Sequence, residues 1–500
     1  MHRTFFRTLA LVVVGSAIFF AAELAFEWWR LGMPGHDATS WEGVNNAKLV
    51  DLMSPLARAY NNILAMLIAT IGLAIPLTAN MHTPKLIDMF LRDRLNQAVL
   101  FLMAFSAANT LWVAYMVGPE FAPMWAVRFA VFGALLGWAI LVPYFFYVVR
   151  FLDPSNILAR LEKDVEDAIE RVRTGALDPD AGQTIVHERL HQIGTIVIKS
   201  LDRTDRGVAL EGIWFLKRLL DFHGQRKKDM PARWFVVDRA DFVGLSAEAI
   251  ALVQDEKLFF ERKVLHQLYL SYQHAVSKAS DVVSSISDAN RVVAIAAAQR
   301  GDEAALQLSI RYFNNFLRES VKSKHVHSIY DVFHQYRLLA TALTGRSDVV
   351  RDVIGYLLGY AEAARAAGLA FVPCFAAFDL ASIALEAGRA KDPGAREIVQ
   401  RVLSLPHRRS GAIEMMVLEA KLKLGAALAA EGTEEASLVR DAIADCSPEE
   451  IRSARDGLLR APRTFHEVTD RQVDFRWVPP EQRPALESFV ATIVPSSAAA

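Results

Sequence analysis

The sequence has very little cysteine, with only Cys374 and Cys446 among its 500 residues. They lie far apart in the chain and form neither a CxxC pair nor a disulfide framework. This is expected if the part of the protein that contains them lies in a reducing compartment. Walker A, GxGxxG, GxSxG and kinase signatures are also missing, so no motif indicates nucleotide binding or serine hydrolysis. The net charge of −1 gives no support for a general nucleic-acid binder.

Charge is scarce over long stretches of the first 150 residues. Four apolar runs there are each about 20 residues or longer, enough to cross a hydrocarbon core of about 30 Å as helices. The first run reads as an uncleaved anchor, because Glu23 and Glu27 follow it instead of a small-residue cleavage site. The sequence therefore predicts a transmembrane domain over 1–152 with four helices, at about 8–27, 60–80, 97–117 and 124–149.

The short connections between these runs differ in their content of Lys and Arg. The N-terminus, the 81–96 connection and the segment after Arg150 are basic, whereas the 118–123 connection holds no Lys or Arg. Positively charged connections stay on the cytoplasmic side of a membrane. We therefore expect four crossings of a cytoplasmic membrane, with both termini and the bulk of the chain in the cytoplasm.

The 81–96 connection contains His82-Thr-Pro-Lys-Leu-Ile-Asp-Met-Phe-Leu-Arg-Asp-Arg-Leu-Asn-Gln-Ala-Val-Leu100. This stretch resembles the turn between the second and third helices of the domain-of-unknown-function family 2254, which groups uncharacterised bacterial predicted membrane proteins. The resemblance covers roughly residues 60–165 and implies four crossings and a cytoplasmic C-terminal part in a bacterial inner membrane. The family has no assigned activity to transfer. The residues that carry the match are Pro84, Phe90, Leu91, Arg92, Asp93 and Arg94.

Strand patterns are nearly absent from the remaining 350 residues, and 233–238 is the only β-like run. Apolar residues recur there at three- and four-residue spacing in segment after segment, which predicts an all-α protein. Tight glycine turns suggest stacked antiparallel helix pairs, as in α-solenoids of the TPR or HEAT kind. We expect a helical cytosolic domain over 153–460 and a proline-rich C-terminal tail over 461–500. The glycines expected to end helices are Gly301, Gly345, Gly368, Gly388 and Gly432.

Polar side chains interrupt the apolar helices. Because polar groups in hydrocarbon need partners, they face other helices or a wet path. One interpretation is a conduction path, formed when the hairpins of the second and third apolar helices from several subunits assemble around an axis. The other is hydrogen bonding between helices, with the Glu23 carboxylate reaching toward the membrane–water interface. The predicted stripe consists of Thr70, Thr78, Ser106, Asn109 and Thr110, and the predicted cytosolic turn presents Arg92, Asp93 and Arg94.

The sharpest motif is His187-Glu188-Arg189-Leu190-His191. On a helix both histidines could bind Zn²⁺, Glu188 would be the general base, and Glu211 has the spacing of a third ligand. Two observations count against a zinc peptidase. Arg189 is charged at a position that is usually uncharged in zinc-peptidase helices, and no strand-rich peptidase subdomain is predicted before the motif. The competing interpretation is an amphipathic helix whose polar face holds two histidines.

Three functions stay open. The first is an oligomeric channel or transport component with a cytosolic regulatory domain, which the sequence favours, as a homo-oligomer without cofactor or enzymatic activity. The second is a membrane-anchored scaffold or sensor that binds a protein partner, and the third is a membrane-bound zinc metallopeptidase. Burial of the polar stripe within one subunit would favour the scaffold, whereas Asn109 or Thr70 facing the axis of a ring would favour the pore.

Overall fold

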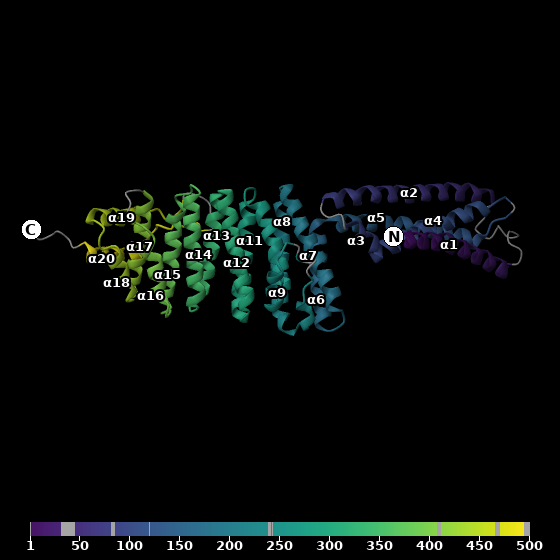
Figure 1. Cartoon of the computed structure of the whole chain (residues 1–500). Coiled ribbons are helices and arrows are strands. Elements are labelled where there is room, and N and C mark those ends of the chain that lie inside the picture. The colour runs from purple at the N-terminus through teal and green to yellow at the C-terminus, as the bar shows by residue number, and fades with distance from the viewer. Residues whose placement is uncertain are drawn as a thin grey trace, which may run out of the picture. The chain divides into compact units, whose positions relative to one another are not determined.

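The computed structural model describes residues 2–31, 46–81, 86–119, 121–238, 242, 244–407, 412–465 and 471–494 (Figure 1). The chain forms two compact units, Met1–Ile157 and Leu158–Ala500. Within the described ranges every regular element is a helix, and the only β contact is an isolated bridge between Thr464 and Val473. The all-α prediction is therefore confirmed.

The first unit, which we call the membrane unit, contains four helices long and apolar enough to cross a membrane. Among them α4 packs against α1, α2 and α5, so it is the central helix of the unit. Large apolar side chains such as Met66 and Leu73 are exposed on the outside, as lipid-facing positions require. The helices of the unit are α1 (His2–Leu31), α2 (Asn46–Met81), the short α3 (Leu86–Arg92), α4 (Arg94–Met116) and α5 (Met124–Leu152).

The second membrane helix is longer than the predicted span of 60–80. It begins at Asn46 and continues through Pro55. Hydropathy identifies only the apolar part of a helix. The charged residues Lys48, Asp51 and Arg58 lower the hydropathy of the first turns of α2, but they do not interrupt the helix. The 81–96 connection also holds more structure than a turn, because it contains α3, while Pro84 and Lys85 lie outside the described residues.

Two glycines of α5 allow polar side chains of its neighbours to approach closely. A Cβ atom at Gly137 would lie 2.0 Å from the hydroxyl of Tyr60, and one at Gly133 would lie 2.5 Å from that of Ser106. Tyr60, on α2, is fully buried. Small residues at such contacts are typical of packed membrane helices.

The second unit, which we call the helical unit, is a two-layered array. Helices α8, α11, α13, α15 and α17 pack successively in one layer, and α10, α12, α14, α16 and α18 in the other. Consecutive helices such as α11 and α12, or α14 and α15, also pack on each other across the two layers. The helices are α6 (Pro154–Arg173), α7 (Pro179–Asp202), α8 (Arg206–Arg226), α9 (Ala247–Asp255), α10 (Phe259–Ala275), α11 (Ser280–Arg300), α12 (Glu303–Ser323), α13 (Val326–Ala342), α14 (Ser347–Ala366), α15 (Val372–Arg389), α16 (Ala395–Leu403), α17 (Ala412–Ala430), α18 (Glu435–Ala442), α19 (Pro448–Arg460) and α20 (Arg483–Ile493), with short 3-10 turns η2 (Lys227–Asp229), η3 (Ala232–Phe235) and η5 (Pro480–Gln482).

Four of the five glycines predicted to end helices have the left-handed backbone that this position needs. For Gly388 the prediction is wrong, because it lies inside α15. A Cβ atom there would lie 2.8 Å from a methyl carbon of Leu428, so this glycine serves close packing of α15 on α17. The four with positive φ are Gly301, Gly345, Gly368 and Gly432.

The β-like run 233–238 forms no strand, and its first half is the turn η3. Trp234 fixes this turn, because its buried indole donates to His223 Nε2 at 3.1 Å. His223 Nδ1 in turn lies 3.1 Å from the buried carboxylate of Glu261. Burial alone would raise the pKa of Glu261, but His223 and Lys227 hold it down to about 2. Tertiary contacts therefore override the local β preference.

The segment after α19 is bound to the helical unit by ion pairs. Arg471 donates both terminal nitrogens to the Asp379 carboxylate at 2.6 Å, and Arg337 Nε lies 3.3 Å from the same group. Arg476 also makes a bidentate pair, donating Nε and Nη2 to the two oxygens of Glu419 at 2.7 Å. Helix α20 packs on α17.

We expect Asp379→Ala to destabilise the helical unit by about 3–5 kcal/mol, because it removes the shared carboxylate partner of the largely buried Arg471 and the partly buried Arg337. Urea unfolding of the full chain, followed by circular dichroism, measures this loss. Glu362→Gln is the control, since it breaks an ion pair with Arg365 whose side chains are about half exposed. Equal urea midpoints for Asp379→Ala and wild type would contradict a stabilising role for the Asp379 ion pairs.

We expect Gly137→Ala to lower the melting temperature of the membrane unit, because the added methyl group overlaps the Tyr60 ring. Gly72→Ala adds the same methyl to α2, where nothing lies within 4 Å. There the helix propensity of alanine should keep or raise the melting temperature. Thermal unfolding in one detergent compares the two, and an equal response would show that α5 does not press on Tyr60.

Candidate functional site

The turn motif, which we define as residues 90–97, joins α3 to α4. Asp93 ends the connection as the N-cap of α4, where its carboxylate accepts from the Asn96 backbone N–H at 2.9 Å. The Tyr147 hydroxyl of α5 donates to the same carboxylate at 2.5 Å. A carboxylate here satisfies an unpaired helix N–H and the positive end of the helix dipole.

The turn motif is also tied to α5 by side chains that the resemblance did not single out. Asn96 Nδ2 donates to the Phe90 carbonyl at 2.9 Å, while its Oδ1 accepts from the Tyr144 hydroxyl. The Phe90 ring is fully buried and meets Phe151 edge to face at 5.2 Å. Phe90 and Asp93 are thus structural, whereas Leu91, Arg92 and Arg94 are exposed.

The three polar residues predicted on one face of α4, Ser106, Asn109 and Thr110, are all buried in helix contacts of a single membrane unit. Asn109 Nδ2 donates to Glu23 Oε1 of α1 at 3.4 Å, and Thr110 donates to the Ser106 carbonyl. Glu23 Oε2 and Asn109 Oδ1 are buried and have no hydrogen-bond partner among the described residues.

Tyr60 belongs to the same region, since its hydroxyl and that of Ser106 face successive turns of α5, at Gly137 and Gly133. We call Glu23, Tyr60, Ser106 and Asn109 the polar cluster. It combines the Glu23–Asn109 contact between α1 and α4 with the Tyr60 and Ser106 hydroxyls of α2 and α4, which face α5. A buried acidic group and three buried neutral groups that bear oxygen can hold a proton, a cation or water.

A second buried carboxylate, Glu27, is fully used by the fold. It accepts from the backbone N–H groups of Met124 and Trp125 at 3.2 and 2.8 Å. These are the first N–H groups of α5, whose N-cap residue, Pro123, makes no side-chain cap. Glu27 of α1 therefore caps the N-terminus of another helix, α5. Glu23, one turn earlier on α1, differs because its Oε2 has no hydrogen-bond partner among the described residues.

The polar groups on the buried face of α4 lie at two levels. Asn96 is near its start, whereas Ser106 and Asn109 belong to the polar cluster. The buried residues between them are Val99 and Met103, both apolar. Ten residues of helix correspond to about 15 Å. On the buried face of α4, two apolar side chains therefore lie between the polar cluster and the turn motif.

The two threonines predicted on α2 do not join the polar cluster. Thr70 is exposed and its hydroxyl donates back to the Met66 carbonyl at 2.8 Å. Thr78 is half-buried and donates to the Ala74 carbonyl at 2.9 Å. Both hydroxyls are satisfied by their own helix.

The motif at 187–191 lies on α7, as its periodicity predicts. Its donor atoms do not converge with Glu211: within the described ranges, His187, His191 and Glu211 form no group of ligand atoms within 4.8 Å of one another. Glu188 is half-buried and His191 is exposed. Arg189, the charged residue in the motif, pairs with Asp164 of α6 at 2.8 Å. The arrangement is that of a polar helix face with an ion pair to its neighbour.

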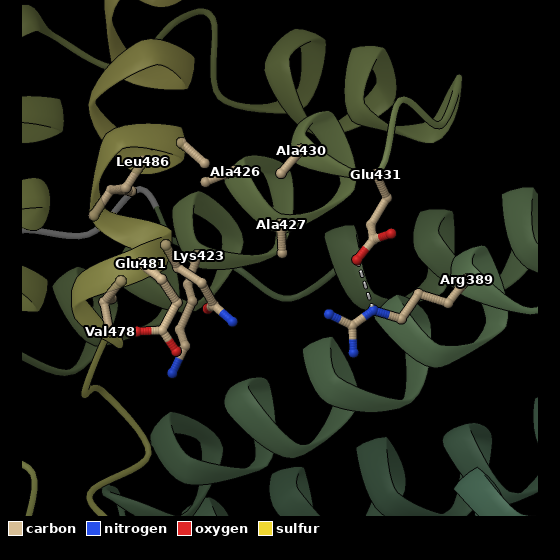
Figure 2. A pocket seen from close by; sticks show the side chains of 11 residues that line it. Arg389, Lys423, Ala426, Ala427, Ala430, Glu431, Val478, Glu481 and Leu486 are labelled. Carbon is tan, nitrogen blue, oxygen red and sulfur yellow. Dashed lines mark hydrogen bonds and ion pairs between the residues drawn. The ribbon is translucent and has the colours of Figure 1, made fainter.

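The helical unit carries two adjoining hollows beside α17, of about 310 and 100 Å³. Figure 2 shows the smaller one, with the Arg389–Glu431 ion pair at 3.0 Å on one side and Lys423 on the other. Lys423 lines both hollows and donates to the carbonyls of Phe475 and Trp477. Burial lowers the pKa of Lys423 to about 8.

The four apolar helices and the turn motif define an integral membrane protein. Residues 2–199 match the family model described as "Predicted membrane protein (DUF2254)", a partial segment of the chain. This match confirms the resemblance at the turn motif and extends beyond residues 60–165. No curated protein matches the chain.

One solved structure gives a weak match. It is a "Circular tandem repeat protein with novel repeat topology and enhanced subunit contact surfaces", with 13% identity and a TM-score of 0.25 over 90% of this chain and 96% of that one. At that TM-score the likeness carries no argument about this protein.

We expect Asp93→Ala to destabilise the membrane unit by about 1–2 kcal/mol, because α4 loses its N-cap and Tyr147 loses its acceptor. Arg92→Ala, at the neighbouring exposed position, is the matched control and should leave stability unchanged. Thermal unfolding in detergent measures both. Similar losses for the two variants would refute the structural division of the turn motif.

Proposed function

We propose that the protein is a membrane transport component in which the polar cluster binds a proton or another small cation on its path through the membrane unit. The observation that supports this most is the buried carboxyl of Glu23, whose Oε2 has no partner among the described residues while Oε1 meets Asn109. Placing an ionisable group inside a membrane is unfavourable, and such groups mark ion pathways and proton relays. A protein that only needs an anchor gains nothing from it.

The proposed path lies inside one membrane unit and not along an axis between subunits. Ser106, Asn109 and Thr110 face the interior of the unit, and Thr70 is on its outside. On this path Val99 and Met103 of α4 would be an apolar barrier between the polar cluster and the turn motif. Opening would require α4 to move against its neighbours, and we propose that the helical unit regulates this movement.

The orientation in the membrane is part of the same proposal. Arg92 and Arg94 are the exposed basic residues of the turn motif, which supports a cytoplasmic position for this end of the unit. Both termini and the helical unit would then lie on the cytoplasmic side of a bacterial inner membrane.

A second candidate is a membrane-anchored scaffold or sensor that binds a partner through the helical unit. Burial of the polar α4 face within a single unit favours it, because a pore between subunits would expose that face. The hollows beside α17 offer a place for a ligand. No zinc peptidase is proposed, since His187, His191 and Glu211 are not brought together.

Flux through liposomes reconstituted with the full chain tests the transport proposal. We expect wild type to carry protons or monovalent cations, and both Glu23→Gln and Asn109→Leu to reduce the rate at least about tenfold. Thr70→Leu is the control, since it removes a polar group from the exposed face of α2 and should keep the wild-type rate.

Two outcomes would count against transport. Wild-type flux equal to that of empty vesicles would remove the proposal and leave the scaffold. Flux that survives Glu23→Gln but is lost in Thr70→Leu would move the path to a surface between subunits.

A further inference from the structure

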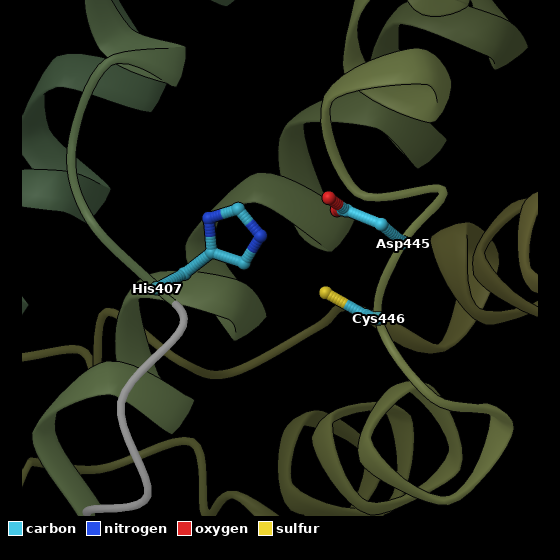
Figure 3. A group of neighbouring side chains, drawn as sticks. All are labelled: His407, Asp445 and Cys446. Carbon is cyan, nitrogen blue, oxygen red and sulfur yellow. The ribbon is translucent and has the colours of Figure 1, made fainter.

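The helical unit brings together three side chains of different metal-binding chemistry. His407 follows α16, and Asp445 and Cys446 lie between α18 and α19. One ligand atom from each lies within 4.8 Å of the others, the only such group among the described residues. Figure 3 shows the three side chains pointing toward a common space. Neither the family resemblance nor the motif at 187–191 involves these residues.

The position of His407 is fixed by a buried lysine. Lys421 of α17 is only 1% exposed, and its ammonium group contacts the carbonyls of Leu403 and Leu405 at 2.7 Å and His407 Nδ1 at 2.9 Å. It thereby binds carbonyls at the C-terminal end of α16, as basic groups commonly do. Since Nδ1 faces Lys421, the nitrogen that faces Asp445 and Cys446 in Figure 3 is Nε2.

The opposite side of the group is held by helix caps. The Cys446 backbone N–H donates to the Ile443 carbonyl at 3.1 Å, at the end of α18. Ser447, the next residue, starts α19 with a capping box in which its side chain and that of Glu450 bind each other's backbone N–H groups. The backbone on both sides of the group is therefore determined by helix ends.

We propose that His407, Asp445 and Cys446 form a transition-metal site that takes Zn²⁺. Imidazole, thiolate and carboxylate are the ligands that zinc takes in proteins, and three protein ligands leave a fourth position for solvent or another donor. With bonds of about 2.0–2.3 Å, donor atoms around tetrahedral zinc lie about 3.3–3.6 Å apart.

The half-buried Cys446 and the exposed Asp445 leave this site open to solvent, so the metal can exchange. Bound zinc would clip the end of α16 to the connection between α18 and α19. The inference is independent of the transport proposal, since it concerns only the helical unit.

Cobalt titration of the chelator-treated full chain in detergent tests the site. We expect one Co²⁺ per chain with a thiolate-to-metal absorption band that Zn²⁺ abolishes. Cys446→Ser should remove the band, and His407→Ala and Asp445→Asn should each weaken Co²⁺ binding at least about tenfold. Circular dichroism of each variant checks that the helical unit is folded.

Two controls separate this site from other donors. Cys374→Ser should keep the band, because that thiol is buried against the Ile413 carbonyl and burial raises its pKa to about 12. His187→Ala should also keep it, which would separate the site from the motif on α7. Zn²⁺ should protect Cys446 from maleimide in wild type but not in His407→Ala.

The proposal is overturned if wild type shows no thiolate band, if the band survives in Cys446→Ser, or if Zn²⁺ leaves maleimide labelling unchanged. Each of these results would mean that the three side chains form only a hydrogen-bonded cluster.

Discussion

The membrane unit depends on how polar groups inside an apolar bundle are satisfied. Asp93 caps α4 and Glu27 caps α5, each by accepting from the first backbone N–H groups of a helix. These two contacts fix the opposite ends of a pair of neighbouring helices that pack directly on each other. Each of these carboxylates thereby satisfies backbone N–H groups that have no partner within their own helix.

Against that background Glu23 is the exception. It is as buried as Glu27, yet it meets only Asn109, at the long distance of 3.4 Å. Gly133 and Gly137 of α5 leave room for the hydroxyls of Ser106 and Tyr60, two other members of the polar cluster. The membrane unit satisfies the Glu27 carboxylate completely and leaves the Glu23 carboxylate partly unsatisfied. Buried polar groups without partners are typical of functional positions.

Buried carboxylates of the helical unit are also paired. The layers of this unit are joined by apolar contacts, and its C-terminal segment is held by bidentate ion pairs to the buried carboxylates of Asp379 and Glu419. Each of these carboxylates receives a guanidinium group from the segment after α19, so the segment is part of the unit and not an appendage. Lys421 and Lys423, two residues apart on α17, each bind carbonyls of a different neighbouring segment.

Sequence patterns predicted the helices better than the sites. Hydropathy found α1, α4 and α5 but not the start of α2 at Asn46, because charge at Lys48 and Asp51 ends an apolar signal and not a helix. The α4 face was evident from spacing, yet its partner Glu23 is 86 positions away and Tyr60 looked like the boundary of a span. His407 and Cys446 carry no local motif, so only the packing of α16 to α19 reveals them. The motif at 187–191 shows the converse, a local match that tertiary structure does not complete.

Infrared difference spectroscopy of reconstituted protein tests the central claim most directly, by following the carboxyl band of Glu23 as pH or cation concentration changes. The account predicts a band that responds reversibly, disappears in Glu23→Gln and persists in Glu27→Gln. A carboxyl signal that does not respond, or that survives in Glu23→Gln, would contradict a cation-binding role for the polar cluster.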